Sequence, residues 1–166
     1  MNPVPCPALP GQVASLHLHP ARSGAPLSMV QSVELVVGKG ILNEPRYFGR
    51  LSHTTGKPSR RQVSLIEREQ IASHASSLGL QSIPPGAVRA NIETTAIDLI
   101  ALLGRHIKIG EAVLYLYEAR MPCGQMDAIC SGLRGLMENN RQGMLAEIIR
   151  PGKIQVGDSI HVIETL

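Results

Sequence analysis

The apolar residues of this chain occur in short runs that glycine and proline interrupt every few positions. The 166 residues include 16 glycines and 12 prolines, and both residue types end helices and central strands. Runs of this length suit strands of about five residues. We expect strands at 33–37, 62–66, 87–93, 106–109, 113–117, 144–149, 153–156 and 159–163, with a less regular one over 13–19.

Helical periodicity is confined to two places, and residues 98–103 are expected to form a single helical turn closed by Gly104. One helix is expected to follow the strand at 62–66 and to end at Gly79, and Ser64 and Glu67 have the spacing of a capping box at its start. The other pattern follows Cys123. Many short strands with two inserted helices favour a β-rich α+β fold, with a closed or partly open barrel. The turn at Gly157-Asp158 predicts that the last two strands form a closing hairpin.

The length and the 43% hydrophobic content suit a single domain with a full core. We place this domain at residues 12–166. Residues 1–11 carry four prolines, which deny the backbone donors and helical geometry, so we expect a flexible arm there and no role for its Cys6.

Aromatic residues are scarce, with three tyrosines, one phenylalanine and no tryptophan. The core must therefore be aliphatic. Single-stranded nucleic-acid binding needs exposed stacking platforms, which this composition does not provide. The net charge of +3 is too small to indicate a polyanion partner, so we expect no nucleic-acid partner.

The three cysteines, an odd number spread along the chain, do not form a disulfide framework. A reducing compartment is the default for such a chain. No apolar run approaches the roughly 18 residues of a membrane span, and the N-terminus does not have the pattern of a signal peptide. These features predict a cytoplasmic protein without a membrane partner.

Common catalytic signatures are absent from the sequence. No GxGxxG, GxxxxGK[ST], GxSxG or HExxH pattern occurs, which argues against dinucleotide, nucleotide, serine hydrolase and zinc protease sites. Cys123 and Cys130 are seven positions apart, which does not fit CxxC redox chemistry or a zinc knuckle. Cys130 lies among apolar residues and is expected to pack in the core.

Cys123 is the strongest candidate for chemistry. Pro122 and Gly124 flank it, and apolar residues recur at helical spacing from Met126 to Leu136, so Cys123 should lie at or just before a helix N-terminus. A thiol there ionises more readily than the free value of about 8.5, and the thiolate is the reactive form. The alternative is a buried, inert cysteine, against which the flanking proline and glycine argue.

A basic segment extends from Gly40 to Arg61 and contains one carboxylate, Glu44. Few of its residues are apolar, so we expect a long loop, and loops of this length are often functional. Arginine suits bidentate recognition of phosphate or carboxylate. The alternative is a solvated basic loop. Its basic residues are Arg46, Arg50, Lys57, Arg60 and Arg61.

Two further pairs of polar residues have strand spacing. Arg89 and Asn91 would share one face of the strand at 87–93 and offer a cation beside an amide to a polar ligand. A solvent-facing strand surface explains them equally well. His17 and His19 would likewise share a face and could bind a metal, but no third ligand lies nearby in the sequence.

Taken in order, these motifs resemble the MOSC domain family, named for the C-terminal part of molybdenum cofactor sulfurases. The resemblance covers roughly residues 33 to 163. The matching segments are 61–67, 85–86 with 89–92, 97–99, 103–104, 109–114, 122–123, 143–146 and 152–158.

The resemblance implies a barrel related to that of the pyruvate kinase insert domain. It also implies that Cys123 carries sulfane sulfur or ligates molybdenum, and that Arg89 and Asn91 lie near the pterin phosphate or the metal centre. Family members commonly have Gly-Asp-Arg-Tyr at a position where this chain has residues 44–47, Glu-Pro-Arg-Tyr. Arg46 keeps its place there, and the carboxylate is displaced by one residue.

The leading hypothesis is a sulfur carrier or molybdenum-cofactor-binding protein. Cys123 would receive sulfur as a persulfide from a cysteine desulfurase and deliver it to a molybdoenzyme or another metal-sulfur acceptor. Arg46, Arg60, Arg61, Arg89 and Asn91 would hold the molybdenum cofactor, and no tightly bound pyridoxal phosphate is expected. One alternative is a molybdenum-dependent reductase of N-hydroxylated compounds, with Cys123 as metal ligand. Another is a non-catalytic cofactor-binding or adaptor module.

Overall fold

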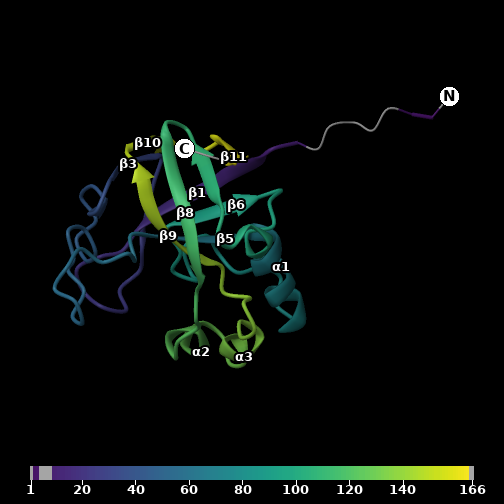
Figure 1. Cartoon of the computed structure of the whole chain (residues 1–166). Coiled ribbons are helices and arrows are strands. Elements are labelled where there is room, and N and C mark those ends of the chain that lie inside the picture. Colours follow the sequence, from purple (N-terminus) through teal and green to yellow (C-terminus); the bar gives the residue numbers. More distant parts are fainter. Residues whose placement is uncertain (1, 4–8, 165–166) are drawn as a thin grey trace.

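The computed structural model describes residues 2–3 and 9–164. Seven strands follow one another in the order β11-β7-β8-β9-β5-β6-β1, and β1 pairs back with β11 to close a barrel (Figure 1). The expected β-rich barrel fold is therefore confirmed. Its strands are β1 (Gly11–Leu18), β5 (Val63–Glu67), β6 (Ile92–Thr95), β7 (His106–Ile109), β8 (Ala112–Ala119), β9 (Met144–Arg150) and β11 (Ser159–Ile163).

One parallel pair makes this closure possible. Around a closed ring the number of antiparallel pairs must be even, so a ring with an odd number of strands needs a parallel pair. That pair is β5 with β6. Parallel neighbours require a crossover connection, which here consists of α1 (Arg68–Ser77) and the loop of residues 78–91.

A smaller sheet, in the order β10-β3-β4, lies beside the barrel. It consists of β3 (Ser32–Val36), β4 (Gly40–Ile41) and β10 (Gly152–Gln155), and β2 (Ser28–Val30) extends the barrel sheet at β1. The predicted hairpin of the last two strands is wrong. β10 pairs with β3, and β11 pairs with β7 and β1. The turn between β10 and β11 is hydrogen-bonded to β1, because Gly157 N donates to Val13 O at 2.8 Å.

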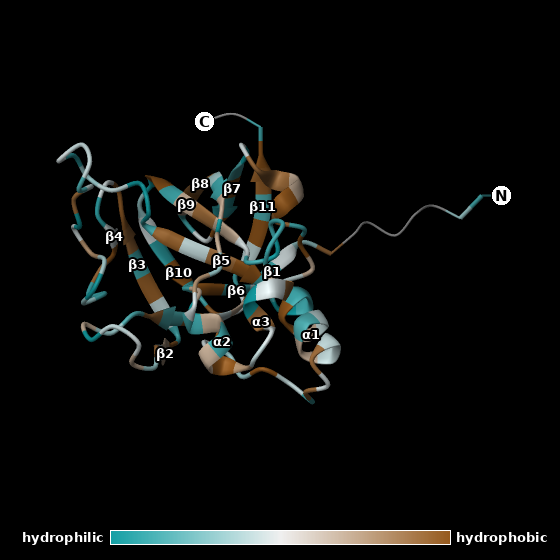
Figure 2. Ribbon diagram, turned by 90° about the horizontal axis from the view of Figure 1, so that it is seen from below, coloured by the Kyte–Doolittle hydropathy of each residue, from teal (hydrophilic) through white to brown (hydrophobic). Residues whose placement is uncertain are grey.

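The core has two parts, and both are aliphatic as the composition predicts. One fills the barrel, whose strands carry apolar stretches (Figure 2), and extends to the smaller sheet through Val33, Leu35, Ile41 and Ile154. The other lies between α1, the crossover loop and two short helices, α2 (Gln125–Ile129) and α3 (Leu133–Leu136), which lie together below the strands in Figure 1. Its buried members are Ile66, Ile71, Ala75, Ile83, Val88, Ala90, Met126, Leu133 and Met137.

Several local predictions need correction. Residues 87–91 are not a strand: β6 begins at Ile92, and the preceding residues form turns. The capping box does not form, because Ser64 bonds to Asn91 while the Glu67 carboxylate accepts the Leu99 amide at 2.8 Å. The helical pattern after Cys123 is interrupted at Gly132, which has φ of 91° and separates α2 from α3.

The remaining segments agree with the expectations in part. The basic stretch is largely a loop, and η1 (Ile100–Leu102) is a single helical turn. Cys130 is half-buried and not fully packed in the core. Gly11 of the expected arm already belongs to β1, and Cys6 lies outside the described residues. No helix in the described part of the chain is both long and apolar enough to cross a membrane.

A buried carboxylate ties the crossover loop to the barrel. Glu93 on β6 is fully buried, accepts two hydrogen bonds from Arg68 at 2.9 and 3.2 Å, and accepts the Gly86 amide at 3.2 Å. Burial by itself raises the pKa of Glu93. The contact with His17, whose Nε2 lies 3.6 Å from Glu93 Oε2, the charge of Arg68 and the Gly86 amide outweigh it, so the pKa lies below its ordinary value.

We expect Gly143→Ala to destabilise the protein by at least about 3 kcal/mol in chemical unfolding. Gly143 has φ of 87°, and a Cβ there would lie 2.0 Å from the Leu65 carbonyl oxygen of β5. Gly104→Ala is the matched control, because Gly104 has φ of 80° and open space around it. The Gly104→Ala variant should lose only about 1–2 kcal/mol of stability, which is the cost of placing alanine in a left-handed conformation. Equal losses of stability in the two variants would rule out the close approach of Gly143, just before β9, to β5.

Stability should depend on the ionised form of Glu93. The pKa of Glu93 is lower in the folded state than in the unfolded state. The stabilisation by its carboxylate is therefore complete at pH values above the unfolded-state pKa, and it is lost as the pH falls through the folded-state pKa. We expect Glu93→Gln to lose about 2–3 kcal/mol at pH 7. The difference from wild type should shrink as the pH falls below about 4.5. The exposed Glu138→Gln variant should stay within about 0.5 kcal/mol of wild type; a pH-independent gap for Glu93→Gln would contradict the assignment.

Candidate functional site

A cavity of about 210 Å³ lies where the barrel meets the loop before α2. Four arginines line it and no carboxylate does, so its field attracts anions. Cys123 lies in the same lining. The lining residues are His19, Arg46, Tyr47, Arg61, Arg89, Arg120, Met121, Cys123, Gln125, Met126 and Gln142.

Cys123 is exposed and lies in the loop between β8 and α2. Its carbonyl accepts the Met126 amide at 3.1 Å, and Gly124 is the N-cap residue of α2. The predicted position just before a helix is therefore confirmed, and the alternative of a buried cysteine is excluded by its exposure. Cys123 is thus both solvent-exposed and part of the cavity lining.

Arg89 is half-buried in the turn that leads into β6, with φ of 65°. A left-handed conformation costs a residue with a side chain about 1–2 kcal/mol. Two side chains hold it there: His19 Nε2 donates to the Arg89 carbonyl at 2.9 Å, and Arg120 Nη2 donates to the same oxygen at 3.0 Å. The Arg89 guanidinium donates to the Ala25 carbonyl at 2.8 Å.

Arg120 was not predicted from the sequence. It follows β8, is 7% exposed, and donates to the Val88 and Arg89 carbonyls at 3.2 and 3.0 Å. No carboxylate of the described residues pairs with it. Burial, reinforced by the charges of Arg61 and Arg89, lowers the pKa of Arg120 to about 10, so it stays charged at neutral pH. A buried cation without a counter-ion is a strong attractor for an anion.

Tyr47 was also missed, although it adjoins the predicted Arg46. The guanidinium carbons of Arg46, Arg50 and Arg61 lie 5.5, 5.6 and 5.6 Å from the centre of its ring. Cations at this distance from an aromatic face are attracted to it. The ring also meets His19 edge-on at 4.9 Å. Tyr47 therefore holds three guanidinium groups near one another, although like charges repel.

Asn91 lies beneath the cavity and does not line it. It is 3% exposed, and its amide donates to Glu44 Oε2 at 2.7 Å and to the His17 carbonyl at 3.0 Å. Its Oδ1 accepts from the amide and the hydroxyl of Ser64, each at 3.1 Å. Glu44 Oε2 in turn accepts from the His19 backbone amide at 2.9 Å. The structure thus places Asn91 as a support for the residues above it.

Two buried acceptor oxygens in this region have no hydrogen-bond partner in the described structure. Gln142, 1% exposed, lines the cavity and uses its amide nitrogen on the Met126 sulfur at 3.5 Å, while its Oε1 accepts nothing. Glu44 Oε1 is likewise without a donor. Unsatisfied buried oxygens are rare in folded proteins, so water or a ligand with a donor group would stabilise this end of the barrel.

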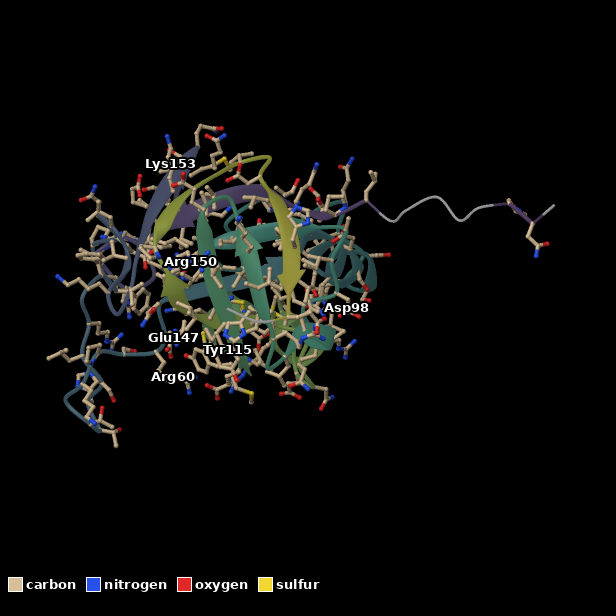
Figure 3. The ribbon with its side chains drawn as sticks, turned by 45° about the horizontal axis from the view of Figure 1, so that its top comes forward. Arg60, Asp98, Tyr115, Glu147, Arg150 and Lys153 are labelled. Carbon is tan, nitrogen blue, oxygen red and sulfur yellow. The ribbon has the colours of Figure 1, made fainter. Side chains whose placement is uncertain are left out.

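Arg60 is placed apart from the other candidates. Its Nε donates to Glu147 on β9 at 2.7 Å, toward which it points in Figure 3, and its guanidinium carbon lies 4.3 Å from the Tyr117 ring centre. This hydrogen bond raises the pKa of Arg60. Arg60 is outside the cavity lining. Of the predicted residues, the cavity brings together Cys123, Arg46, Arg61 and Arg89.

The described residues contain no cluster of three or more histidines, cysteines or carboxylates that could hold a metal ion. His17 and His19 bond to different carboxylates, Glu93 and Glu44, and so do not form a pair for a metal. The chemistry available is that of an exposed thiol beside guanidinium groups. Such a site can bind an anion and present it to sulfur.

The family model of the MOSC domain matches residues 22–161. The chain belongs to the MOSC domain family. The YuaD protein from Bacillus subtilis has a similar fold, with a TM-score of 0.78 and 19% identity over 95% of this chain and 98% of that one. YiiM from Escherichia coli gives a TM-score of 0.65 with 19% identity, over 95% of this MOSC domain and 70% of YiiM.

YiiM from Geobacillus stearothermophilus gives a TM-score of 0.64 with 14% identity, over 93% of this chain and 76% of that chain. No curated protein matches the sequence. At these identities the structural likeness shows that the MOSC fold is shared and carries no residue assignments.

We expect Arg89→Asn to weaken the binding of inorganic phosphate by at least about fivefold, since a guanidinium contact with an anion contributes about 1 kcal/mol or more. Asparagine tolerates the left-handed backbone, so the melting temperature should change little. Isothermal titration calorimetry and thermal unfolding measure the two effects. Arg60→Asn, outside the cavity, is the matched control and should leave phosphate affinity within twofold. Equal effects of the two substitutions would mean that the cavity does not bind the anion.

Proposed function

We propose that this MOSC domain is a sulfur carrier that binds the molybdenum cofactor or a related anionic sulfur acceptor. The observation that carries the proposal is the exposed Cys123 thiol in the lining of a cavity with four arginines and no carboxylate. A thiol alone would support many functions. The surrounding cations restrict the acceptor to an anion.

The sulfur step requires a donor persulfide, such as that of a cysteine desulfurase. The Cys123 thiolate attacks the terminal sulfur of the donor, a new sulfur–sulfur bond forms on Cys123, and the donor cysteine leaves as a thiolate with the electron pair of the broken bond. Exposure of Cys123 lets a protein donor reach it. In delivery, a nucleophilic acceptor takes the terminal sulfur and Cys123 leaves as a thiolate.

The residues present fit a phosphorylated, sulfur-bearing cofactor. Arg46, Arg61, Arg89 and Arg120 would hold its anionic groups, and the free Gln142 oxygen offers an acceptor to a donor group of the ligand. When bound, the molybdenum cofactor would supply a metal centre that takes up sulfur. Cys123 would face that centre as carrier or as ligand.

The test is mass spectrometry of the intact protein after incubation with a cysteine desulfurase and free cysteine. Wild type should gain one sulfur atom, which dithiothreitol removes, and Cys123→Ala should gain none. Cys130→Ala is the matched control, since Cys130 is half-buried outside the cavity lining, and it should load as wild type does. A gain that persists in Cys123→Ala would refute the carrier mechanism.

Wild type and Cys123→Ala also distinguish the carrier function from the reductase and adaptor functions. If wild type gained no sulfur but reduced an N-hydroxylated base once loaded with molybdenum cofactor, and Cys123→Ala did not, the reductase function would replace the carrier function. If wild type and Cys123→Ala bound the cofactor equally well, and wild type neither gained sulfur nor reduced the base, the adaptor function would remain.

A further inference from the structure

A second hollow, of about 280 Å³, adjoins the Cys123 cavity on the side of the basic loop. The two share Tyr47 and Arg61, so these side chains form the wall between them. Hydroxyl and cationic side chains dominate the second hollow. Its lining residues are Tyr47, Arg50, Leu51, Ser52, His53, Thr54, Ser59 and Arg61.

The donors in this hollow are the kind that bind phosphate. Arg50 Nη2 donates to His53 Nε2 at 3.4 Å, and the hydroxyls of Ser52, Thr54 and Ser59 line the same hollow and can donate to an anion. No carboxylate lines the hollow. Arg50 forms no ion pair with the described residues, whereas Arg60, Arg68 and Arg105 each pair with a glutamate.

The backbone of the loop is organised around this hollow. Leu51 and Pro58 form an isolated β-bridge. Ser52 N donates to the Lys57 carbonyl at 2.8 Å, and Ser59 N donates to the Arg50 carbonyl at 3.0 Å. These bonds place Arg50 and Ser59 next to each other on a closed turn, so their donors are positioned before a ligand binds.

The shared tyrosine fixes how far apart the two sites can be. Arg46 faces the Cys123 cavity, Arg50 faces the second hollow, and both guanidinium carbons lie within 5.6 Å of the Tyr47 ring centre. They are therefore at most twice 5.6 Å apart. Guanidinium groups within this range repel one another, and no carboxylate lines either hollow. Two linked anionic groups of one ligand would offset that repulsion.

We infer that the ligand of this MOSC domain carries two anionic groups, as a nucleoside diphosphate does. One group binds in the Cys123 cavity and the other binds in the subsite of Arg50, His53 and the loop hydroxyls. This deepens the proposed function and rests on it, because it specifies that the ligand of the Cys123 cavity extends past Tyr47 toward the loop.

Isothermal titration calorimetry with guanosine diphosphate and with inorganic phosphate tests the inference. Guanosine diphosphate should bind wild type at least about tenfold more tightly than phosphate, because it fills both sites. Arg50→Gln should weaken guanosine diphosphate binding by about tenfold and leave phosphate affinity within twofold. Lys57→Gln is the matched control: it removes one positive charge from the same loop, but Lys57 lines neither hollow, so both affinities should stay within twofold.

Three outcomes would overturn the inference. These are equal affinities of wild type for the two probes, equal losses in Arg50→Gln and Lys57→Gln, and a loss in Arg50→Gln that is the same for both probes. None of them involves sulfur. Cys123→Ala should retain the preference for guanosine diphosphate, so a failure of sulfur loading would leave the subsite standing, and a failure of the subsite would leave the sulfur assay unaffected.

Discussion

The Arg89 carbonyl oxygen is the acceptor on which the arrangement of the site depends. It receives hydrogen bonds from His19, just after β1, and from Arg120, just after β8, which are far apart in the sequence. Both donors act on a residue in a left-handed conformation. The backbone turn and the two side chains therefore stabilise one another, and the crossover loop that closes the barrel also forms one wall of the cavity.

The polar groups next to the cavity hold the only carboxylate of the basic loop outside the cavity lining. Glu44 is the carboxylate nearest to the arginines along the loop, yet it is 2% exposed and its Oε2 is occupied by His19 and Asn91. It therefore supports the histidine and does not line the cavity with the guanidinium groups. A buried network of this kind is stable only if most of its members are satisfied, and the amide of Asn91 supplies the donors and acceptors that achieve this.

The barrel could be predicted from the sequence because the alternation of apolar and polar residues and the turn residues are local signals. The strands β7 and β11 begin and end where glycine and polar residues predict. It failed where partners are distant: nothing near residues 153–163 indicates that β10 pairs with β3. For the site, cysteine chemistry indicated Cys123, but Arg120 follows a regular strand and has no motif. Only the tertiary fold shows that its guanidinium is buried beneath the turn of Arg89. Arg89 itself was selected for a strand face that does not exist.

The segment that carries Cys123 leaves and re-enters the barrel at neighbouring points. Ala119 and Met144 are paired across β8 and β9, and the Arg120 amide donates to the Gly143 carbonyl at 2.9 Å. Residues 121–142 are thus an excursion whose two ends are held together by the sheet itself. Such an excursion can vary in length and sequence at its exposed positions while the strands keep their register. The barrel can therefore serve as a constant frame on which differently shaped thiol-bearing loops meet the same group of arginines.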